Sequence, residues 1–213
     1  MEDVNGFQSA LLEWFSTAGR SFPWRAAEAT RYEVFVAEFF LTQTPAENVA
    51  TVYPTFIEQF PSLPSIDDSA EEAVRTTIRP LGFQRMRAAA LKEIAAVRDE
   101  LPGDVETMQS LPRVGPYVSN ATLCFSESRS LPIVDRNVRR VYRRIWPTTY
   151  PDPDTAAETA FVRRLLPEDG RRARDYNLAL LDLGAALCTA SDPLCANCPV
   201  AEWCAYAAER PAD

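Results

Sequence analysis

Apolar side chains recur at helical spacing through most of the chain. Phe7, Leu11 and Phe15, for example, are four residues apart, which is the period of one helix face. No stretch alternates as a strand does, and Pro132 weakens the best extended candidate, Leu131–Val134. The pattern predicts an all-α fold with helices at 7–18, 32–43, 46–60, 67–78, 85–100, 105–110, 116–126, 136–146, 154–166 and 173–187.

Composition places the chain among globular proteins. It has 213 residues, of which 46% are hydrophobic and 10% aromatic. No apolar run reaches the roughly 18–20 residues that a membrane span needs, and the N-terminus lacks the basic and apolar segments of a signal peptide. We therefore expect a cytoplasmic protein that does not enter a membrane. The proline-rich stretch 146–154 is the best candidate for a domain boundary.

The charge balance is acidic but uneven. Lys and Arg total 22 against 30 Asp and Glu, a formal net charge of −8, which argues weakly against a generic binder of nucleic acid. Five arginines crowd positions 136–144 and three more lie at 79–87, so a local basic face can still exist. The chain has no histidine, which excludes histidine catalysis and ligation, and Lys92 is its single lysine.

Four of the five cysteines lie close together near the C-terminal end. Cys188, Cys195, Cys198 and Cys204 form the pattern C-x6-C-x2-C-x5-C. Four thiolates at this spacing suit zinc or an iron–sulfur cluster. Zinc ribbons usually pair two C-x2-C knuckles, and the single knuckle here favours a [4Fe–4S] cluster. Four unrelated buried cysteines are the alternative, and we expect the fifth, Cys124, to pack in the core.

A glycine-containing turn separates two predicted helices. In Leu111–Tyr117, Gly115 can adopt a backbone conformation that other residues avoid, and Pro116 suits the first turn of a helix. The free N–H groups at that helix start would suit a phosphate. An ordinary connection between helices remains the alternative.

Two carboxylates differ in their expected surroundings. Asp135 precedes a predicted helix, where backbone N–H groups and the positive helix end favour its ionised form. A plain helix cap is the alternative. Glu38 lies in an otherwise apolar helix, and burial there should raise its pKa. A narrow polar stripe shared with Thr42 is its alternative. Such a pair can supply one acid and one ion stabiliser.

The chain resembles the helix-hairpin-helix DNA glycosylases that carry an iron–sulfur cluster. This group includes endonuclease III, the adenine glycosylase MutY and the Mig-type thymine mismatch glycosylases. The resemblance runs from about Phe7 to Cys204. Its markers are Phe22–Arg25, Ala37–Thr44, the hairpin Leu111–Gly115, Ile133–Val138, Asp175–Asn177 and the four cysteines.

The resemblance implies a two-domain fold. Residues 27–135 would form a six-helix barrel with the helix-hairpin-helix. Residues 1–26 and 136–213 would together form the domain with the [4Fe–4S] cluster. The implied partner is double-stranded DNA with a mismatched or damaged base, which is flipped out of the helix. We expect a monomer in the cytoplasm, associated with the nucleoid.

The resemblance also assigns catalytic roles. Asp135 matches the catalytic aspartate of the family, and Glu38 matches the glutamate of MutY enzymes. Lyase members carry a lysine two residues after the hairpin glycine, where this chain has Tyr117. Lys92 lies on another helix, so we expect hydrolysis of the glycosidic bond without strand cleavage.

DNA contacts are implied at three places. Arg113, Val114 and Gly115 belong to the hairpin, where Arg113 replaces the usual first glycine. That replacement adds a phosphate contact or distorts the turn. Phe83 and Gln84 match the loop that wedges into the duplex. Gln43 matches a residue that reaches toward the opposite base.

The base pocket is implied to include Trp24, Arg25, Ala46 and Leu178. MutY enzymes place Glu or Gln at the position of Leu178, and tend to have valine at that of Ala46. The sequence ends soon after Cys204, so we expect MutY's additional C-terminal domain to be absent. These features favour thymine or uracil opposite guanine. A minimal adenine glycosylase and a non-catalytic damage-binding module are the alternatives.

Overall fold

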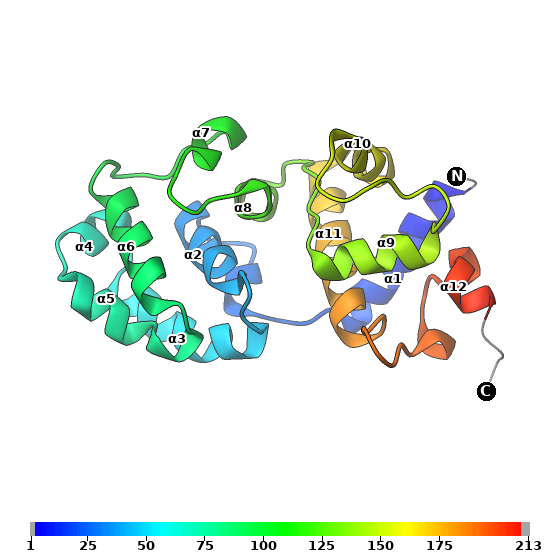
Figure 1. Ribbon diagram of the computed structural model, residues 1–213, viewed down its shortest axis with the longest axis horizontal. Coiled ribbons are helices and arrows are strands. Elements are labelled where there is room, and N and C mark those ends of the chain that lie inside the picture. Colours follow the sequence, from blue (N-terminus) through cyan, green and yellow to red (C-terminus); the bar gives the residue numbers. More distant parts are fainter. Residues whose placement is uncertain (1–2, 210–213) are drawn as a thin grey trace. The chain divides into compact units, whose positions relative to one another are not determined.

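The computed structural model describes residues 3–209, and the all-α prediction is confirmed. No strand occurs in that part of the chain. None of its helices is long and apolar enough to cross a membrane. The helices are α1 (Val4–Ala18), α2 (Arg31–Leu41), α3 (Ala46–Gln59), α4 (Leu63–Asp67), α5 (Glu71–Thr77), α6 (Gln84–Ala95), α7 (Val105–Gln109), α8 (Pro116–Glu127), α9 (Arg136–Ile145), α10 (Ala156–Leu165), α11 (Gly170–Ala186) and α12 (Ala205–Ala208) (Figure 1).

The chain divides into two compact units. Unit 1 combines Met1–Arg20 with Ser128–Asp213, and unit 2 is the continuous segment Ser21–Glu127. These boundaries differ from the expected 26/27 and 135/136. Trp24 packs into unit 2, with its ring 4.7 Å from that of Phe22 and edge-on to Tyr53. The segment before Asp135 belongs to unit 1, where Asn177 Nδ2 donates to the Leu131 carbonyl at 3.0 Å.

Unit 1 is built around an aromatic core. Helices α1 and α9 both pack on α11 (Figure 1), and Phe7 from α1 meets Trp146 and Tyr176 edge-on. The proline-rich stretch 146–154 is therefore not a boundary. It lies inside unit 1, because Trp146 and Tyr150 pack against the buried core.

Unit 2 has α2 at its centre, packed against α3 and α8. A capping box starts α2, in which the Thr30 and Glu33 side chains each bond the other's backbone N–H. Within α2 every residue from Val34 to Phe40 is buried. An otherwise apolar helix therefore carries Glu38 inside the unit.

Most predicted helices match, and two differ. The predicted helix 67–78 begins too early: the helix there is α5, Glu71–Thr77, and residues 68–70 separate it from α4, which ends at Asp67. Lys92 Nζ donates to the carbonyls of Ile66, Asp67 and Ser69 at 3.0, 2.6 and 2.8 Å, which satisfies the C-terminal end of α4. The predicted helix 85–100 ends at Ala95, five residues early.

Candidate active site and cysteine centre

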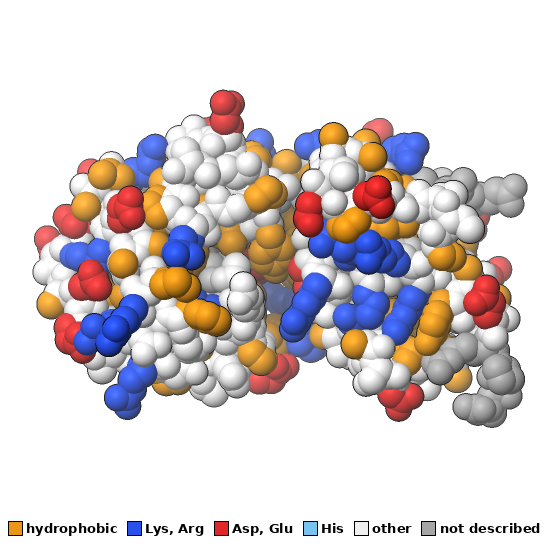
Figure 2. All heavy atoms as spheres, viewed as in Figure 1, with side chains coloured by type: hydrophobic (Ala, Val, Ile, Leu, Met, Phe, Trp, Pro, Cys, Tyr) orange, Lys and Arg blue, Asp and Glu red, His pale blue; other side chains and the backbone are white. Residues whose placement is uncertain are grey.

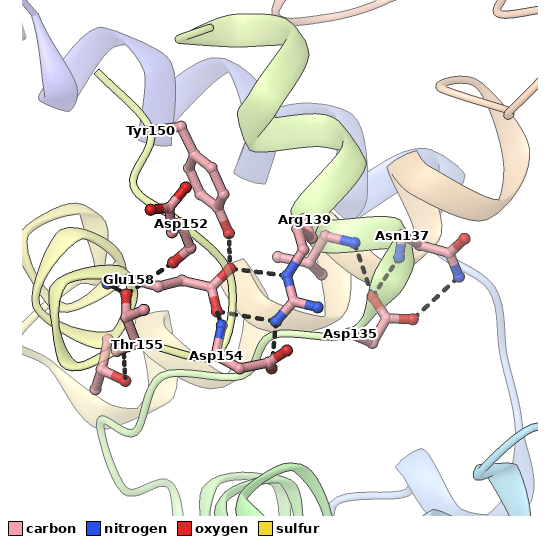
Figure 3. Close-up of polar contacts among 10 residues, drawn as sticks. Asp135, Asn137, Arg139, Tyr150, Asp152, Asp154, Thr155 and Glu158 are labelled. Atoms are coloured by element: carbon pink, nitrogen blue, oxygen red, sulfur yellow. Dashed lines mark hydrogen bonds and ion pairs between the residues drawn. The ribbon is translucent and has the colours of Figure 1, made fainter. Parts of the chain in front are cut away.

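Asp135 caps helix α9, as the sequence predicts. One of its oxygens accepts from the backbone N–H groups of Asn137 and Val138 at 2.9 and 2.7 Å, and the other accepts from the Asn137 side chain at 3.1 Å (Figure 3). Three donors and the positive end of α9 thus surround one carboxylate. The carboxylate is held in one orientation and suited to stabilising a cation.

A second polar network lies one turn further along α9. The Arg139 guanidinium donates two hydrogen bonds, of 2.8 and 2.9 Å, to the carboxylate of Glu158 on α10 (Figure 3). It also donates to Asp154 at 2.8 Å, and the Tyr150 hydroxyl donates to Glu158. Burial alone would raise the pKa of Glu158, but hydrogen bonds from Arg139, Tyr150 and the Asp154 amide outweigh it and lower the pKa. The network fixes α9 to α10.

Glu38 and Tyr117 are in contact inside unit 2. Glu38 is only 2% exposed, and the Tyr117 hydroxyl donates to its Oε2 at 2.8 Å. Tyr117 lies in the first turn of α8, directly after the hairpin. Glu38 lies in an apolar interior, as expected, because every residue from Val34 to Phe40 is buried. The other candidate catalytic carboxylate, Asp135, belongs to unit 1 and not to unit 2.

The hairpin joins α7 to α8 and corrects one expectation. Gly115 was expected to take a conformation that other residues avoid, but its φ is not positive; the left-handed residue is Arg113, with φ 60°. The left-handed position is thus the one where the resembling hairpins have their first glycine and this chain has Arg113. A Cβ on Gly115 would meet no protein atom within 4 Å. Nothing in the described protein therefore requires glycine there, which leaves space for a close ligand.

The other implied DNA contacts lie on two loops of unit 2. Gln43 follows α2 with φ 60°, and Phe83 precedes α6 with φ 50°. Phe83 is 52% exposed, and Gln84 is the first residue of α6. Exposed non-glycine residues in the left-handed region are uncommon and point to function.

The residues assigned to the base pocket divide between the units. Trp24, Arg25 and Ala46 belong to unit 2 and Leu178 to unit 1. Trp24 and Leu178 are each 2% exposed. Arg25 stacks over the Phe22 ring at 5.1 Å, and Ala46 begins α3. Their roles in base selection stay predictions.

The four C-terminal cysteines form one group in unit 1. Burial raises the pKa of Cys198 to about 11, and the nearby thiols of the other three add to the effect. No three His, Cys, Asp or Glu side chains within residues 3–209 are placed to hold a single metal ion together. A [4Fe–4S] cluster binds one thiolate at each of four irons, so its ligands need not converge on one point. The arrangement fits a cluster.

Arg144 connects α9 to this group. Its guanidinium donates to Cys188 Sγ at 3.2 Å and to the Thr189 and Ala190 carbonyls, and its own carbonyl accepts from Cys204 Sγ at 3.5 Å. When bound, the cluster would tie Cys188, Cys195, Cys198 and Cys204 into one loop.

A basic face runs along α9, as the uneven charge predicts. Figure 2 shows blue side chains gathered over this helix. They line a hollow of about 460 Å³, and the arginines involved are Arg136, Arg139, Arg140, Arg143 and Arg144. An acidic protein thus presents a local surface suited to phosphates.

Three polar residues near these sites have no role assigned to them from the sequence. Asn137 and Asn177 position the Asp135 segment through the bonds described above. Arg87 is 4% exposed on the buried face of α6. A signal for it exists, because Arg87 shares the helical period of Leu91 and Ile94, both apolar.

These features define a class of protein: an all-α, helix-hairpin-helix protein with a capped aspartate and a four-cysteine centre. Comparison with known proteins agrees. Residues 36–165 match the HhH-GPD superfamily of base excision DNA repair proteins, and residues 188–204 match the iron–sulfur binding domain of endonuclease III. The chain belongs to the HhH-GPD superfamily, and its segment 188–204, which contains the four cysteines, is an iron–sulfur domain of the kind that holds a [4Fe–4S] cluster.

Individual relatives fall into two groups. The chain is 37% identical over 204 residues to the adenine DNA glycosylase of Mycobacterium tuberculosis, covering 92% of this chain but 66% of that protein. It is 32% identical over 212 residues to the thymine-DNA glycosylase of Aeropyrum pernix, covering 95% of each. The solved structure of a thermostable thymine-DNA glycosylase matches with a TM-score of 0.91 and 27% identity over 98% of both chains. This chain thus spans just under two thirds of the length of the adenine DNA glycosylase of Mycobacterium tuberculosis.

Proposed function

We propose that the protein is a monofunctional DNA glycosylase that excises thymine or uracil mispaired with guanine. The observation that carries the proposal is the buried Glu38 that accepts a hydrogen bond from Tyr117 at the start of the hairpin helix. Burial of a carboxyl is costly, so a carboxyl kept inside an otherwise apolar helix calls for a functional reason. It suits a group that acts on a bound substrate.

The proposed chemistry separates charge between sugar and base. Cleavage of the N-glycosidic bond leaves positive charge on the sugar and negative charge on the departing base. Asp135, fixed by three donors, stabilises the sugar cation and orients the attacking water. Glu38 donates a proton or a hydrogen bond to the leaving base.

Tyr117 supports hydrolysis without a lyase step. Resembling lyases carry a lysine at this position to form a Schiff base, and a phenol cannot replace that amine. The only lysine, Lys92, donates to three carbonyls at the C-terminal end of α4. Its amine is committed to holding that helix end.

The choice of pyrimidine rests on Leu178 and Ala46. Leu178 is buried and carries no group that could pair with the edge of adenine. A second candidate function, excision of adenine opposite guanine or 8-oxoguanine, is favoured by the higher identity to the adenine enzyme of Mycobacterium tuberculosis.

One set of duplexes tests both functions. Duplexes containing T:G, U:G, A:G and A:8-oxoguanine are incubated with the protein and divided between alkali and borohydride. We expect strand breaks at T:G and U:G only after alkali, and no covalent adduct with borohydride. Preferred cleavage of A:G would replace the pyrimidine assignment with the adenine one. Cleavage of none would leave a damage-binding module, and efficient trapping would refute the monofunctional mechanism.

A further inference from the structure

Arg87 is a buried cation that bonds two separate loops of unit 2. Its Nη1 donates to the carbonyls of Leu81 and Gly82, both at 3.0 Å. Its Nη2 donates to the carbonyls of Phe40 and Thr42 at 3.0 and 2.7 Å, and to Thr44 Oγ1 at 2.8 Å. Every one of these acceptors is uncharged, so among residues 3–209 the guanidinium has no carboxylate to offset its burial.

The two loops share an unusual feature. Each presents one exposed, non-glycine residue in the left-handed region: Gln43 with φ 60° and Phe83 with φ 50°. Each residue lies directly beside an acceptor of Arg87, since Gln43 stands between Thr42 and Thr44 and Phe83 follows Gly82. The guanidinium carbon also lies 5.8 Å from the centre of the Phe83 ring. Arg87 therefore fixes the backbone beside both exposed residues.

A purely structural purpose accounts poorly for this arrangement. An apolar residue on the same face of α6 would avoid burying a charge, and a left-handed backbone without glycine costs further free energy. The features together suit two side chains that must meet a partner at a fixed separation.

We propose that Arg87 is a positioning residue that fixes the spacing between Gln43 and Phe83, so that the two contact one base step of duplex DNA together. Phe83 stacks against unpaired bases, and Gln43 supplies amide hydrogen bonds to a base edge. Discrimination between partner bases then depends on a guanidinium that touches neither. This proposal rests on the proposed action on mispaired DNA.

The test measures discrimination rather than activity alone. For the mispair that wild type cleaves best, single-turnover rates are compared for the same target base opposite guanine and opposite its matched partner. We expect Arg87→Ala and Arg87→Lys to lower the ratio of these rates by about 10-fold or more, since a displacement of about 1 Å can cost roughly 100-fold in rate. Lysine keeps the charge but cannot reach both sets of acceptors.

Two further readouts separate positioning from folding. A 2-aminopurine beside the target should brighten on binding of wild type, as the wedge unstacks it, and brighten less with either variant. Methylguanidinium should restore part of the ratio in Arg87→Ala. Arg85→Ala is the matched control, because it removes the same charge from an exposed position on the same helix. It should leave the ratio unchanged.

The proposal is overturned if a folded Arg87→Lys keeps the wild-type ratio and fluorescence, or if rates fall equally on both duplexes. Should both Arg87 variants fail to fold, Thr44→Val removes one acceptor at constant volume, and an unchanged ratio in that variant overturns the proposal. Wild type itself reports on the proposed function. If it cleaves only adenine mispairs, the pyrimidine assignment fails, and the Arg87 comparison is made on those mispairs.

Discussion

The Tyr117 hydroxyl is a single atom on which two functions converge. The resemblance places Tyr117 where lyases carry a lysine, and the structure has its hydroxyl donating to the carboxyl of Glu38 at 2.8 Å. The bond keeps Glu38 in one rotamer inside an apolar helix. A buried acid that must give its proton or hydrogen bond to a substrate needs such an orienting partner.

Tyr117→Phe should slow base excision by roughly 10-fold to 100-fold while leaving affinity for mispaired DNA unchanged, because it removes orientation without removing charge. Glu38→Gln should have at least as large an effect, and the double variant should be no slower than Glu38→Gln alone. Single-turnover kinetics and binding to a non-cleavable duplex measure both.

Two reference variants frame that result. Tyr53→Phe removes a similar hydroxyl bond, 3.2 Å long, to the backbone of α2 and should leave the rate unchanged. Asp135→Asn should lose roughly 100-fold or more in rate, the scale of one preorganised electrostatic group. A strictly additive Tyr117 and Glu38 double variant would show that the two act separately.

The sequence predicts single residues well where the local backbone decides their environment. Asp135 as a cap and the cysteine spacing are legible because neighbours in sequence supply their partners. Tyr117 and Glu38 are 79 positions apart, and only the family resemblance relates them. Arg113 and Gly115 show the limit: the turn is predictable, but which of its residues becomes left-handed depends on how α7 and α8 are joined.

Helix α9, which Asp135 caps, is held by contacts with two neighbouring helices, α11 and α10. Asn137, which bonds Asp135, lies against Gly184 of α11, where an added Cβ would be 2.9 Å from Asn137 Cβ and 3.3 Å from its carbonyl. One turn away, Arg139 ties α9 to Glu158 of α10. The orientation of one carboxylate thus depends on the contacts of a whole helix.

Gly184→Ala should destabilise the protein by about 1–3 kcal/mol, because the methyl group overpacks the contact with α9. The sign is informative, since glycine to alanine within a helix normally stabilises by about 1 kcal/mol. Excision should slow more than stability alone explains, as Asn137 moves from Asp135. Gly103→Ala is the control, because its Cβ would meet nothing closer than 3.4 Å.

Glu158→Gln should lower the free energy of unfolding at pH 7 by about 2 kcal/mol, the value of hydrogen bonds to a charged group. The folded-state pKa of Glu158 is lowered, so its contribution is complete above its unfolded pKa near about 4.3 and is lost as pH falls through the folded value. Melting temperatures of wild type and variant should therefore converge only in acid. The exposed Glu13→Gln should match wild type throughout.

The sequence predicted helices well where the apolar periodicity is strong, and less well where capping contacts determine where a helix begins or ends. The break between α4 and α5 depends on Lys92, which reaches three carbonyls from another helix. No local pattern announces such a partner. The proline-rich stretch 146–154 likewise suggested a boundary, yet its aromatic residues reach the core of unit 1.

The segment that carries the cysteines packs against the core of unit 1. Val200 is buried in the core, and Trp203 meets Phe7 edge-on at 6.2 Å. Cys195→Ser should remove the cluster's absorbance near roughly 400 nm and lower the melting temperature, because one iron loses its ligand. Cys124→Ser, at the buried cysteine outside the group, should keep the colour. A colourless native protein with one bound zinc would contradict the cluster.

Unit 1 is assembled from both ends of the chain, which has a consequence for synthesis on the ribosome. Gln8 of α1 and Arg20 just after the helix are made early, yet the residues that they bond, Leu165 and Asp182, follow more than 150 residues later. Unit 2 can collapse as soon as Glu127 has emerged, since its segment is continuous. We expect Phe7 and Leu11 of the nascent helix α1 to stay exposed until α11 has been synthesised and can pack on them. A chaperone that shields short apolar segments should therefore crosslink to α1 in stalled chains ending before α11, and release it once the chain extends beyond α11.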